Sequence, residues 1–317
     1  MIVTRAPFRV SLFGGGTDFK KYFFNNKSQI LSFSINKYIY VLAKKRFDNQ
    51  YYLNYSKKEI CSDKNKIKHE LIREVIKYFN INFGLEISII SDIPSKGSGL
   101  GSSSALINAL ILAISQLINK KLSQKKIAEI AVDIELNKLK KPIGIQDQYG
   151  TAIGNLKIIT MYRDFVKVKI IQKKNLINFI QNYSVIYDTR KNRKAEEILK
   201  SQNKNISKNI NNLIAINKIT NNVIKNLDQL KLQSFINQLN ESWYHKKKLE
   251  KKITNSTIEL KINYLKSLGF RAFKLCGAGK GGFIYAVRDK LAKHYKDSNI
   301  YSLKLDTEGV KVLYKLK

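Results

Sequence analysis

The chain contains 317 residues, 44% of them hydrophobic, and its 58 Lys and Arg against 24 Asp and Glu give a formal net charge of +34. This length suits one large or two medium domains, and the longest apolar run, residues 105–118, is too short and too polar to cross a membrane. The 49 Lys and 9 Arg are scattered along the chain, which argues against a specific nucleic-acid surface because base readout favours arginine.

Strand and helix patterns alternate in the first half of the chain. Apolar alternation predicts a strand over 3–12, and residues 31–43 predict a pair of strands that turns at Asn36 and Lys37. Other strands are expected over 51–55 and 85–89, with a hairpin over 158–171. Helical spacing predicts helices over 67–79, 102–119 and 123–139, and a further one that opens within 144–153.

The pattern changes over 172–182, so we place a boundary there between two domains, residues 1–175 and 176–317. A strand is expected over 184–187, and Asn- and Lys-rich helices with an Ile/Leu stripe follow from 195 to about 268. The remaining residues predict strands over 272–275 and 283–287, a short helix near 290–296, and strands near 300–305 and 310–314. This order favours an α+β second domain.

A segment rich in glycine and serine, Gly97–Ala105, lies directly before an apolar helix. Glycine lets the backbone approach phosphate oxygens and adopt positive φ, and the first turn of the helix offers unpaired N–H groups. The segment therefore indicates a phosphate cradle, although it lacks the usual P-loop pattern. The alternative is a serine-rich helix cap after a tight turn.

Three other segments accompany this loop: RAPFRVSLFGGGTDF at Arg5–Phe19, GIQDQYG at Gly144–Gly150 and KLCGAGKGG at Lys274–Gly282. In this order and spacing, the four motifs resemble those of the GHMP small-molecule kinases. The GGGTD sequence at Gly14–Asp18, where galactokinases carry Gly-Glu-His-Thr-Asp, resembles the D-glycero-D-manno-heptose 7-phosphate kinases of that family. SFSINKY at Ser32–Tyr38 and QDQY at Gln146–Tyr149 support the same subfamily.

The resemblance implies a two-domain α+β fold, with an N-terminal ATP-binding domain that contains a left-handed crossover and a C-terminal ferredoxin-like domain. It implies an enzyme that uses ATP and Mg²⁺ to phosphorylate the anomeric hydroxyl of D-glycero-D-manno-heptose 7-phosphate, for GDP-heptose synthesis and surface polysaccharide. No signal-peptide pattern opens the sequence, so we expect a cytoplasmic protein without membrane or specific nucleic-acid partners. Whether it forms a homodimer is left open.

The resemblance also implies which residues contact ATP and its metal ion. Mg²⁺ is expected at Ser103 and at a carboxylate on the following helix, for which Glu135 is the first candidate and Asp133 the second. The ATP phosphates are expected at Lys96, Gly97, Ser98, Gly99, Gly101, Ser102 and Ser103.

Two residues are expected to carry the chemistry. Asp147 matches the catalytic aspartate of galactokinase-like members and is expected to accept the proton of the attacking hydroxyl, or to orient it. Arg9 is expected to stabilise the transferred phosphoryl group and to hold Asp147 ionised. The structural alternatives are a helix-capping aspartate and a salt bridge at the end of a strand.

The acceptor is expected to bind the N-terminal glycine turn, the C-terminal glycine loop and a basic helix start. Arg193, with Arg190 as the second candidate, is expected to hold the distal phosphate of the sugar. Asp18 is expected to accept hydrogen bonds from the sugar hydroxyls. The other expected acceptor-binding residues are Gly14, Gly15, Gly16, Thr17, Gly277 and Gly279.

Two alternative functions are left open. One is a fucokinase- or galactokinase-like enzyme for an unphosphorylated sugar, against which the missing Glu-His before Thr17 argues in the galactokinase case. The other is a basic nucleic-acid-binding protein on the same fold, because a fold does not determine a function.

Overall fold

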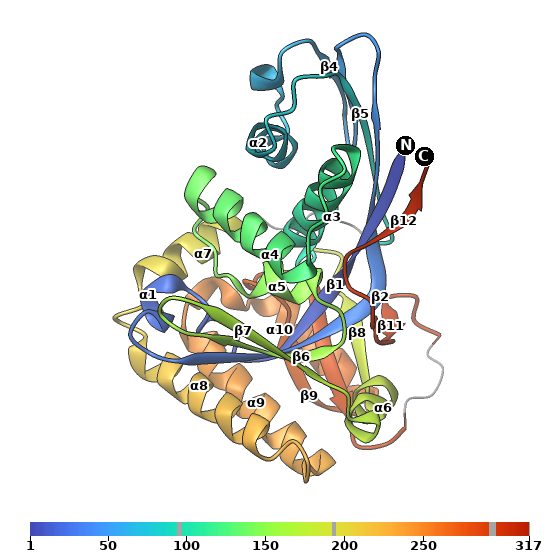
Figure 1. The fold of residues 1–317 in the computed structure, drawn as a ribbon. Coiled ribbons are helices and arrows are strands. Elements are labelled where there is room, and N and C mark those ends of the chain that lie inside the picture. The colour runs from blue at the N-terminus through green and yellow to red at the C-terminus, as the bar shows by residue number, and fades with distance from the viewer. Residues whose placement is uncertain (94–96, 192–194, 292–295, 317) are drawn as a thin grey trace.

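The structure is a computed structural model that describes residues 1–93, 97–191, 195–291 and 296–316. Within these residues the strands form one sheet of eight strands and a second sheet of four. Helices cover the sheets, and the two longest strands run from the upper part of the molecule to its lower part (Figure 1).

The antiparallel pair β1 (Ile2–Phe13) and β2 (Ser28–Lys45) forms the centre of the eight-stranded sheet. Apolar residues of β1, including Phe8, Val10 and Leu12, are completely buried. The sheet order is β12–β1–β2–β5–β3–β4, and β6 and β7 extend from β2 on another path. Their bounds are β3 (Tyr51–Asn54), β4 (Lys58–Cys61), β5 (Leu85–Ser91), β6 (Leu156–Met161), β7 (Val166–Ile171) and β12 (Lys311–Lys315).

The predicted pair of strands over 31–43 is wrong, because β2 is one continuous strand. Its register against β1 shifts where Pro7 faces Tyr38 but Phe8 faces Ile35, so Asn36 and Lys37 form a bulge. The extra residues need no turn, because a β-bulge accommodates them and bends the strand. The freed Asn36 N–H donates to the Lys304 carbonyl at 3.0 Å, which ties the bulge to the C-terminal part of the chain.

Helices pack against the eight-stranded sheet, and the central one is α3 (Ser102–Leu117). It contacts β1 and β2 on one side and neighbouring helices on the others, which explains why it is apolar almost all round. The helices in contact with it are α2 (Glu70–Tyr78), α4 (Gln124–Val132) and α5 (Gln146–Ala152), and η1 (Lys64–Lys66) contacts α2. A short helix, α1 (Lys20–Phe23), follows β1.

The helix predicted over 123–139 divides into α4 and a π-helical segment, Asp133–Lys138. The Leu139 N–H donates to the Ile134 carbonyl five residues earlier, at 2.9 Å. Such wide turns are rare and are frequent at functional sites. This one carries Glu135.

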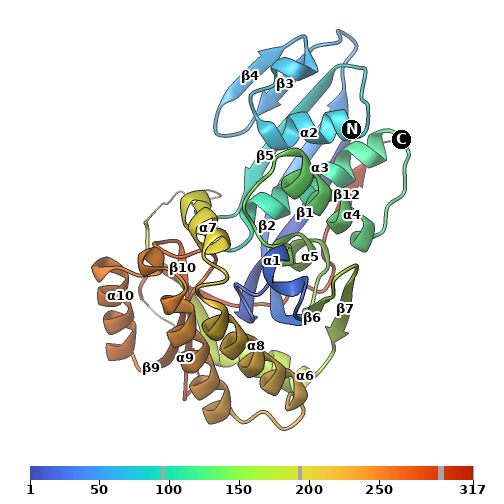
Figure 2. The same ribbon diagram turned by 90° about the vertical axis from the view of Figure 1, so that its left-hand side faces the viewer.

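The second sheet is antiparallel with the strand order β11–β8–β10–β9, and it lies in the lower half of the molecule as drawn in Figure 1. Helices α8 and α9 lie side by side, and α9 and α10 pack against β9 (Figure 2). The strands are β8 (Ser184–Asp188), β9 (Phe270–Leu275), β10 (Phe283–Arg288) and β11 (Ile300–Ser302). The helices are α6 (Lys174–Tyr183), α7 (Ala195–Lys204), α8 (Ile210–Lys225), α9 (Leu232–Lys248), η3 (Lys251–Ile253) and α10 (Ser256–Ser267).

The last strand does not follow the predicted boundary at 175/176. β12 pairs with β1 in the first sheet, with Ile2 opposite Lys315. The connection before it is held there as well, since the Asp306 N–H donates to the Ser34 carbonyl at 3.0 Å. The short helix predicted near 290–296 falls mostly on 292–295, outside the described residues.

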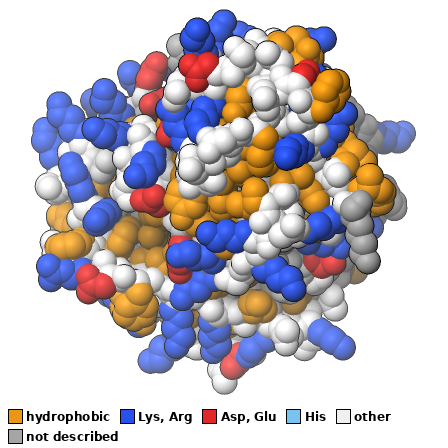
Figure 3. All heavy atoms as spheres, turned by 45° about the horizontal axis from the view of Figure 1, so that its top comes forward, with side chains coloured by type: hydrophobic (Ala, Val, Ile, Leu, Met, Phe, Trp, Pro, Cys, Tyr) orange, Lys and Arg blue, Asp and Glu red, His pale blue; other side chains and the backbone are white. Residues whose placement is uncertain are grey.

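No helix among the described residues is long and apolar enough to cross a membrane. On the face drawn in Figure 3, Lys and Arg side chains are spread over the surface rather than gathered into one stripe. Hydrophobic side chains also reach the surface in the middle of this face.

Candidate active site

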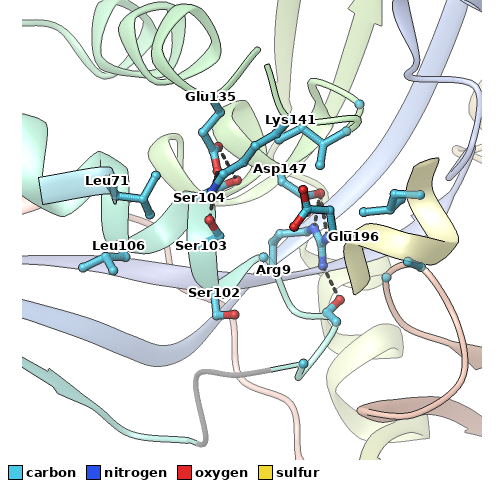
Figure 4. A pocket seen from close by; sticks show the side chains of 18 of the residues that line it. Arg9, Leu71, Ser102, Ser103, Ser104, Leu106, Glu135, Lys141, Asp147 and Glu196 are labelled. Carbon is cyan, nitrogen blue, oxygen red and sulfur yellow. Dashed lines mark hydrogen bonds and ion pairs between the residues drawn. The ribbon is translucent and has the colours of Figure 1, made fainter. Parts of the chain in front are cut away.

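A cavity of about 800 Å³ brings together the four sequence motifs. Its walls come from β1, the glycine turn after it, the loop before α3, the π-helix and α5 on one side. α7, α9, the loop after β9 and residues between β3 and the start of α2 also contribute to it. Figure 4 shows Ser103 and Ser104 pointing toward Glu135 in one part of the cavity, and Asp147 meeting Arg9 in another.

The loop before α3 has the backbone that a phosphate cradle needs. Gly97, Gly99 and Gly101 have φ of 71°, 76° and 80°, a region that favours glycine. At Gly101 a methyl group would also lie 3.0 Å from Thr151 Cγ2. The first three residues of α3, Ser102, Ser103 and Ser104, line the cavity, and the first N–H groups of a helix have no partner within it. The predicted contact at Lys96 lies outside the described residues.

Arg9 joins three of the motifs. Its side chain, only 2% exposed, extends from β1, where Nε and Nη2 donate to Asp147 Oδ1 at 3.0 and 2.6 Å. Nη1 donates to the Gly99 carbonyl at 2.8 Å. Arg9 lies inside the strand, and Asp147 is the second residue of α5 rather than its cap.

Asp147 keeps one carboxylate oxygen available to a ligand. Its side chain is 31% exposed, and no described residue donates a hydrogen bond to Oδ2. A carboxylate held at one oxygen and open at the other can accept a hydrogen bond or a proton from a hydroxyl in the cavity.

Glu135 is completely buried beside the start of α3. Its carboxylate accepts hydrogen bonds from Ser103 Oγ at 2.9 Å, Ser104 Oγ at 3.1 Å and Gln148 Nε2 at 2.6 Å. Burial raises the pKa of Glu135, whereas the Lys141 ammonium, 3.8 Å away, and these donors act in the opposite direction.

The Ser103 hydroxyl and the Glu135 carboxylate fit a magnesium ion. Mg²⁺ prefers oxygen ligands and usually takes one or two carboxylates together with substrate phosphates. Asp133 does not line the cavity and instead accepts a hydrogen bond from Asn137 at 2.7 Å. Among the described residues no group of three His, Cys, Asp or Glu could hold a metal, so phosphate oxygens would complete the coordination.

The glycine turn after β1 places Asp18 at the cavity. Gly14 and Gly16 have φ of 88° and 106°, and Thr17 Oγ1 donates to the Gly14 carbonyl at 2.8 Å. Asp18 accepts hydrogen bonds from the backbone N–H groups of Gly16 and Gln146, at 3.1 and 3.4 Å. Burial raises the pKa of Asp18, and the negative charge of Asp147 adds to this effect.

The loop after β9 packs on the phosphate loop. The Phe283 N–H donates to the Ser98 carbonyl at 3.0 Å, and a methyl group on Gly282 would overlap that carbonyl. Gly279, with φ of 119°, leaves room for Ile253, whose Cα would lie 2.6 Å from a methyl group there. Gly277 lines the cavity, where its carbonyl accepts a hydrogen bond from Lys246 Nζ at 2.8 Å.

Comparisons with known proteins find similarity to several small-molecule kinases. The sequence pattern of the GHMP kinases N terminal domain matches residues 65–155. The chain is 29% identical to the D-glycero-alpha-D-manno-heptose 7-phosphate kinase of Campylobacter jejuni over 92% of this chain and 91% of the relative. It is also 27% identical to the mevalonate kinase of Saccharolobus solfataricus, over 81% of this chain and 80% of that protein.

The chain belongs to the GHMP kinase family. It is an ATP-dependent phosphotransferase that acts on an alcohol group. Its fold also matches a solved D-glycero-D-manno-heptose 1-phosphate kinase from Bacteroides thetaiotaomicron, with a TM-score of 0.78 at 20% identity over the whole of both chains. The galactokinase of Lactococcus lactis, solved with galactose, gives a TM-score of 0.74 at 18% identity over 98% of this chain and 94% of that one.

One group of predicted residues is not brought into the cavity of this GHMP kinase. Arg190 does not line it, and its Nε donates to Asn299 Oδ1 at 2.6 Å. Arg193, the first candidate for the distal phosphate, lies outside the described residues.

Other side chains at the cavity of the GHMP kinase were missed by sequence reasoning. Gln148 does not line the cavity itself but donates to Glu135, which does; it lies within a quoted motif, so its side chain could have been examined as a partner of Glu135. Lys246 belongs to a run of three lysines that nothing in the sequence distinguishes from a solvated helix end. Lys141 and Glu196 also line the cavity, and the sequence carries no signal for either.

Proposed function

We propose that this GHMP kinase transfers the γ-phosphoryl group of ATP to the anomeric hydroxyl of D-glycero-D-manno-heptose 7-phosphate. The observation that carries the proposal is the Arg9–Asp147 pair, which lies in one cavity with the phosphate loop. The similarity to the Campylobacter jejuni kinase over almost the whole length of both chains supports the choice of substrate. The product would then supply GDP-heptose synthesis for surface polysaccharide.

Asp147 would act on the attacking hydroxyl. Its open Oδ2 can accept the hydrogen bond of that hydroxyl and orient its lone pair toward the γ-phosphorus. As the bond forms, the hydroxyl becomes acidic and its proton can pass to the same oxygen. The bonds from Arg9 to Oδ1 hold the carboxylate in this orientation.

Arg9 would also stabilise the charge that develops on the transferred group. Its guanidinium is fixed between Asp147 and the Gly99 carbonyl, so little reorganisation is needed when the phosphoryl group moves. The backbone N–H groups of the phosphate loop and the start of α3 would bind the remaining phosphate oxygens.

Ser103 and Glu135 would hold Mg²⁺ together with the nucleotide phosphates. When bound, the ion neutralises negative charge on the phosphates. The Ser104 hydroxyl and the Gln148 amide, which both donate to Glu135, would orient the carboxylate toward the ion.

The test is turnover of ATP by the purified protein with Mg²⁺ against D-glycero-D-manno-heptose 7-phosphate, mannose 6-phosphate, fucose, galactose and no sugar. We expect turnover with the heptose phosphate and a 1,7-bisphosphate product. Turnover with an unphosphorylated sugar alone would overturn the substrate and favour the galactokinase-like alternative, which the position of Arg190 outside the cavity also favours. Absence of turnover with every sugar would contradict a sugar kinase of this specificity.

A further inference from the structure

We propose that Lys246 binds the distal phosphate of the acceptor, in the part of the cavity formed by the glycine turn, α5 and the loop after β9. The inference rests on the proposed function, because it assumes an acceptor that carries a phosphate. It assigns to the last turn of α9 a role in choosing the substrate.

Lys246 is placed at the acceptor end of the cavity. It lines the cavity although its side chain is only 6% exposed, and its ammonium group donates to the Gly277 carbonyl at 2.8 Å. The same cavity is lined by Gly16 and Asp18 of the glycine turn and by Gln146 of α5, the helix that carries Asp147. An ammonium in this position can reach an acceptor whose hydroxyl lies at Asp147.

A second donor converges on the same place. A methyl group built on Gly15 would lie 3.2 Å from Lys246 Nζ and 3.8 Å from Gln146 Nε2. The ammonium and the amide therefore flank one small space beside the glycine turn. The hydroxyl oxygen of Ser11 lies 3.4 Å from the same methyl position. This hydroxyl is buried and has no hydrogen-bond partner among the described residues. Donors arranged in this way suit the oxygens of a phosphate.

A second lysine, Lys274, lies next to this space, and the negative charge of Asp18 acts on it as well. Lys274 is buried next to this space, where its ammonium donates to the carbonyls of Ser11 and Leu12 at 2.8 and 3.0 Å. Burial lowers the pKa of Lys274 well below its ordinary value, and the charge of Lys246 is the next largest cause. A dianion bound at Lys246 would relieve this repulsion between neighbouring cations.

The other described cations lie elsewhere in the wall. Lys141 contacts Glu70 and Glu135 beside the proposed metal position, and Lys57 and Lys68 belong to segments between β3 and α2. Arg9 is held by Asp147 and Gly99. Among the described residues of the wall, Lys246 is thus the cation contributed by the C-terminal half of the chain.

The test compares two acceptors and three variants. Initial rates are measured for the wild type, K246M, K246Q and the control K248M with D-glycero-D-manno-heptose 7-phosphate and with the same heptose lacking the phosphate. An acceptor that is not turned over is measured as a competitive inhibitor. K246Q keeps an N–H donor for the Gly277 carbonyl but removes the charge. Lys248 is exposed on the same helix.

We expect K246M and K246Q to raise KM for the heptose 7-phosphate about 10- to 100-fold, because a charge-assisted hydrogen bond is lost. KM for ATP and the unfolding temperature should not change. K248M should give the wild-type KM for both acceptors. With the unphosphorylated heptose, the Lys246 variants should bind as the wild type does.

An equal loss with both acceptors would overturn the inference, since Lys246 would then act on a part that they share. No change in KM with either acceptor would overturn it too. Failure of the proposed function is distinguished by the wild type, which would show no turnover of the heptose phosphate at all.

Discussion

At the scale of single residues, Arg9 connects segments that are about 90 and 138 positions away in the sequence. Its three hydrogen bonds use up most of the donors of a side chain that is almost completely buried. A buried guanidinium is costly unless it is paired, so the ion pair with Asp147 and the bond to Gly99 specify how the three motifs meet. The strand-end salt bridge considered from the sequence does not describe this residue.

Asp147→Asn should remain folded and lose roughly 10²–10⁴-fold in kcat, because an amide cannot accept the proton of the attacking hydroxyl. The measurement is kcat with saturating ATP and acceptor, together with the unfolding temperature. Asp164→Asn, at an exposed position between β6 and β7, is the matched control and should behave as the wild type. Turnover by Asp147→Asn close to that of the control would remove Asp147 as the base.

Glu135→Gln should raise the Mg²⁺ concentration for half-maximal activity at least about tenfold, because it replaces a charged ligand by a neutral one. The measurement is a Mg²⁺ titration of the initial rate at saturating ATP. Asp133→Asn, two residues away on the same π-helix, should leave the titration unchanged because Asp133 does not line the cavity. A larger effect at Asp133 than at Glu135 would reverse the assignment.

At the scale of elements, two glycine-rich loops from opposite halves of the chain pack against each other. The Phe283 N–H donates to the Ser98 carbonyl, and Thr189 Oγ1 donates to the Gly282 carbonyl at 2.6 Å. The second loop thereby supports the backbone of the phosphate loop from behind. Glycine is required at Gly282 for two separate reasons, its φ of 86° and the close approach of the Ser98 carbonyl.

Gly282→Ala should therefore destabilise the protein by about 2–5 kcal/mol and raise KM for ATP, because strain and a steric overlap add. The measurement is the free energy of unfolding by denaturant, with KM for ATP alongside. Gly269→Ala is matched in φ, at 89°, but the nearest atom belongs to the flexible end of Arg288 at 3.3 Å. It should cost about 1–2 kcal/mol and leave KM unchanged. Equal costs at the two positions would contradict the packing argument.

At the scale of the whole molecule, the C-terminal segment binds the two sheets together. It leaves the second sheet after β11, contacts the bulge of β2, and ends as the strand β12 beside β1. Lys157 is completely buried near this crossing. Its ammonium donates to Ser34 Oγ at 2.7 Å and to the Gly150 carbonyl at 3.1 Å. A buried lysine at this junction makes global stability depend on pH.

Burial lowers the pKa of Lys157 to about 7, against an opposing effect of Asp306. Between pH 7 and about 10 the unfolded chain keeps this proton and the folded protein releases it. The free energy of unfolding should therefore rise with pH across this range, by at most about 1.4 kcal/mol per pH unit from this group. Lys157→Met should remove this rise, measured by denaturant unfolding at several pH values.

Lys167→Met, at an exposed position on the neighbouring strand β7, is the control and should keep the wild-type pH dependence. If Lys157→Met and the control show the same slope between pH 7 and 10, Lys157 is not the group that releases the proton.

The sequence alone was sufficient for the family and for the order of nearly all strands and helices, and it supplied the candidate residues of the site. Each of these depends on local patterns: glycine where φ is positive, alternation in strands, and helical spacing in helices such as α3. Asp147 and Ser103 lie inside such motifs, so residue type and spacing single them out as candidates.

Only the tertiary structure decided which distant groups meet. The strand β12 returned to the first sheet because its partner is the free edge of β1, and Asn36 and Lys37 became a bulge because both halves of β2 pair with one strand. Glu135 lines the cavity and Asp133 does not, although both lie on the same π-helix, and Lys246 entered the cavity through the packing of α9 on β9. These outcomes depend on long-range packing and on the cost of burying charge, which no local pattern records.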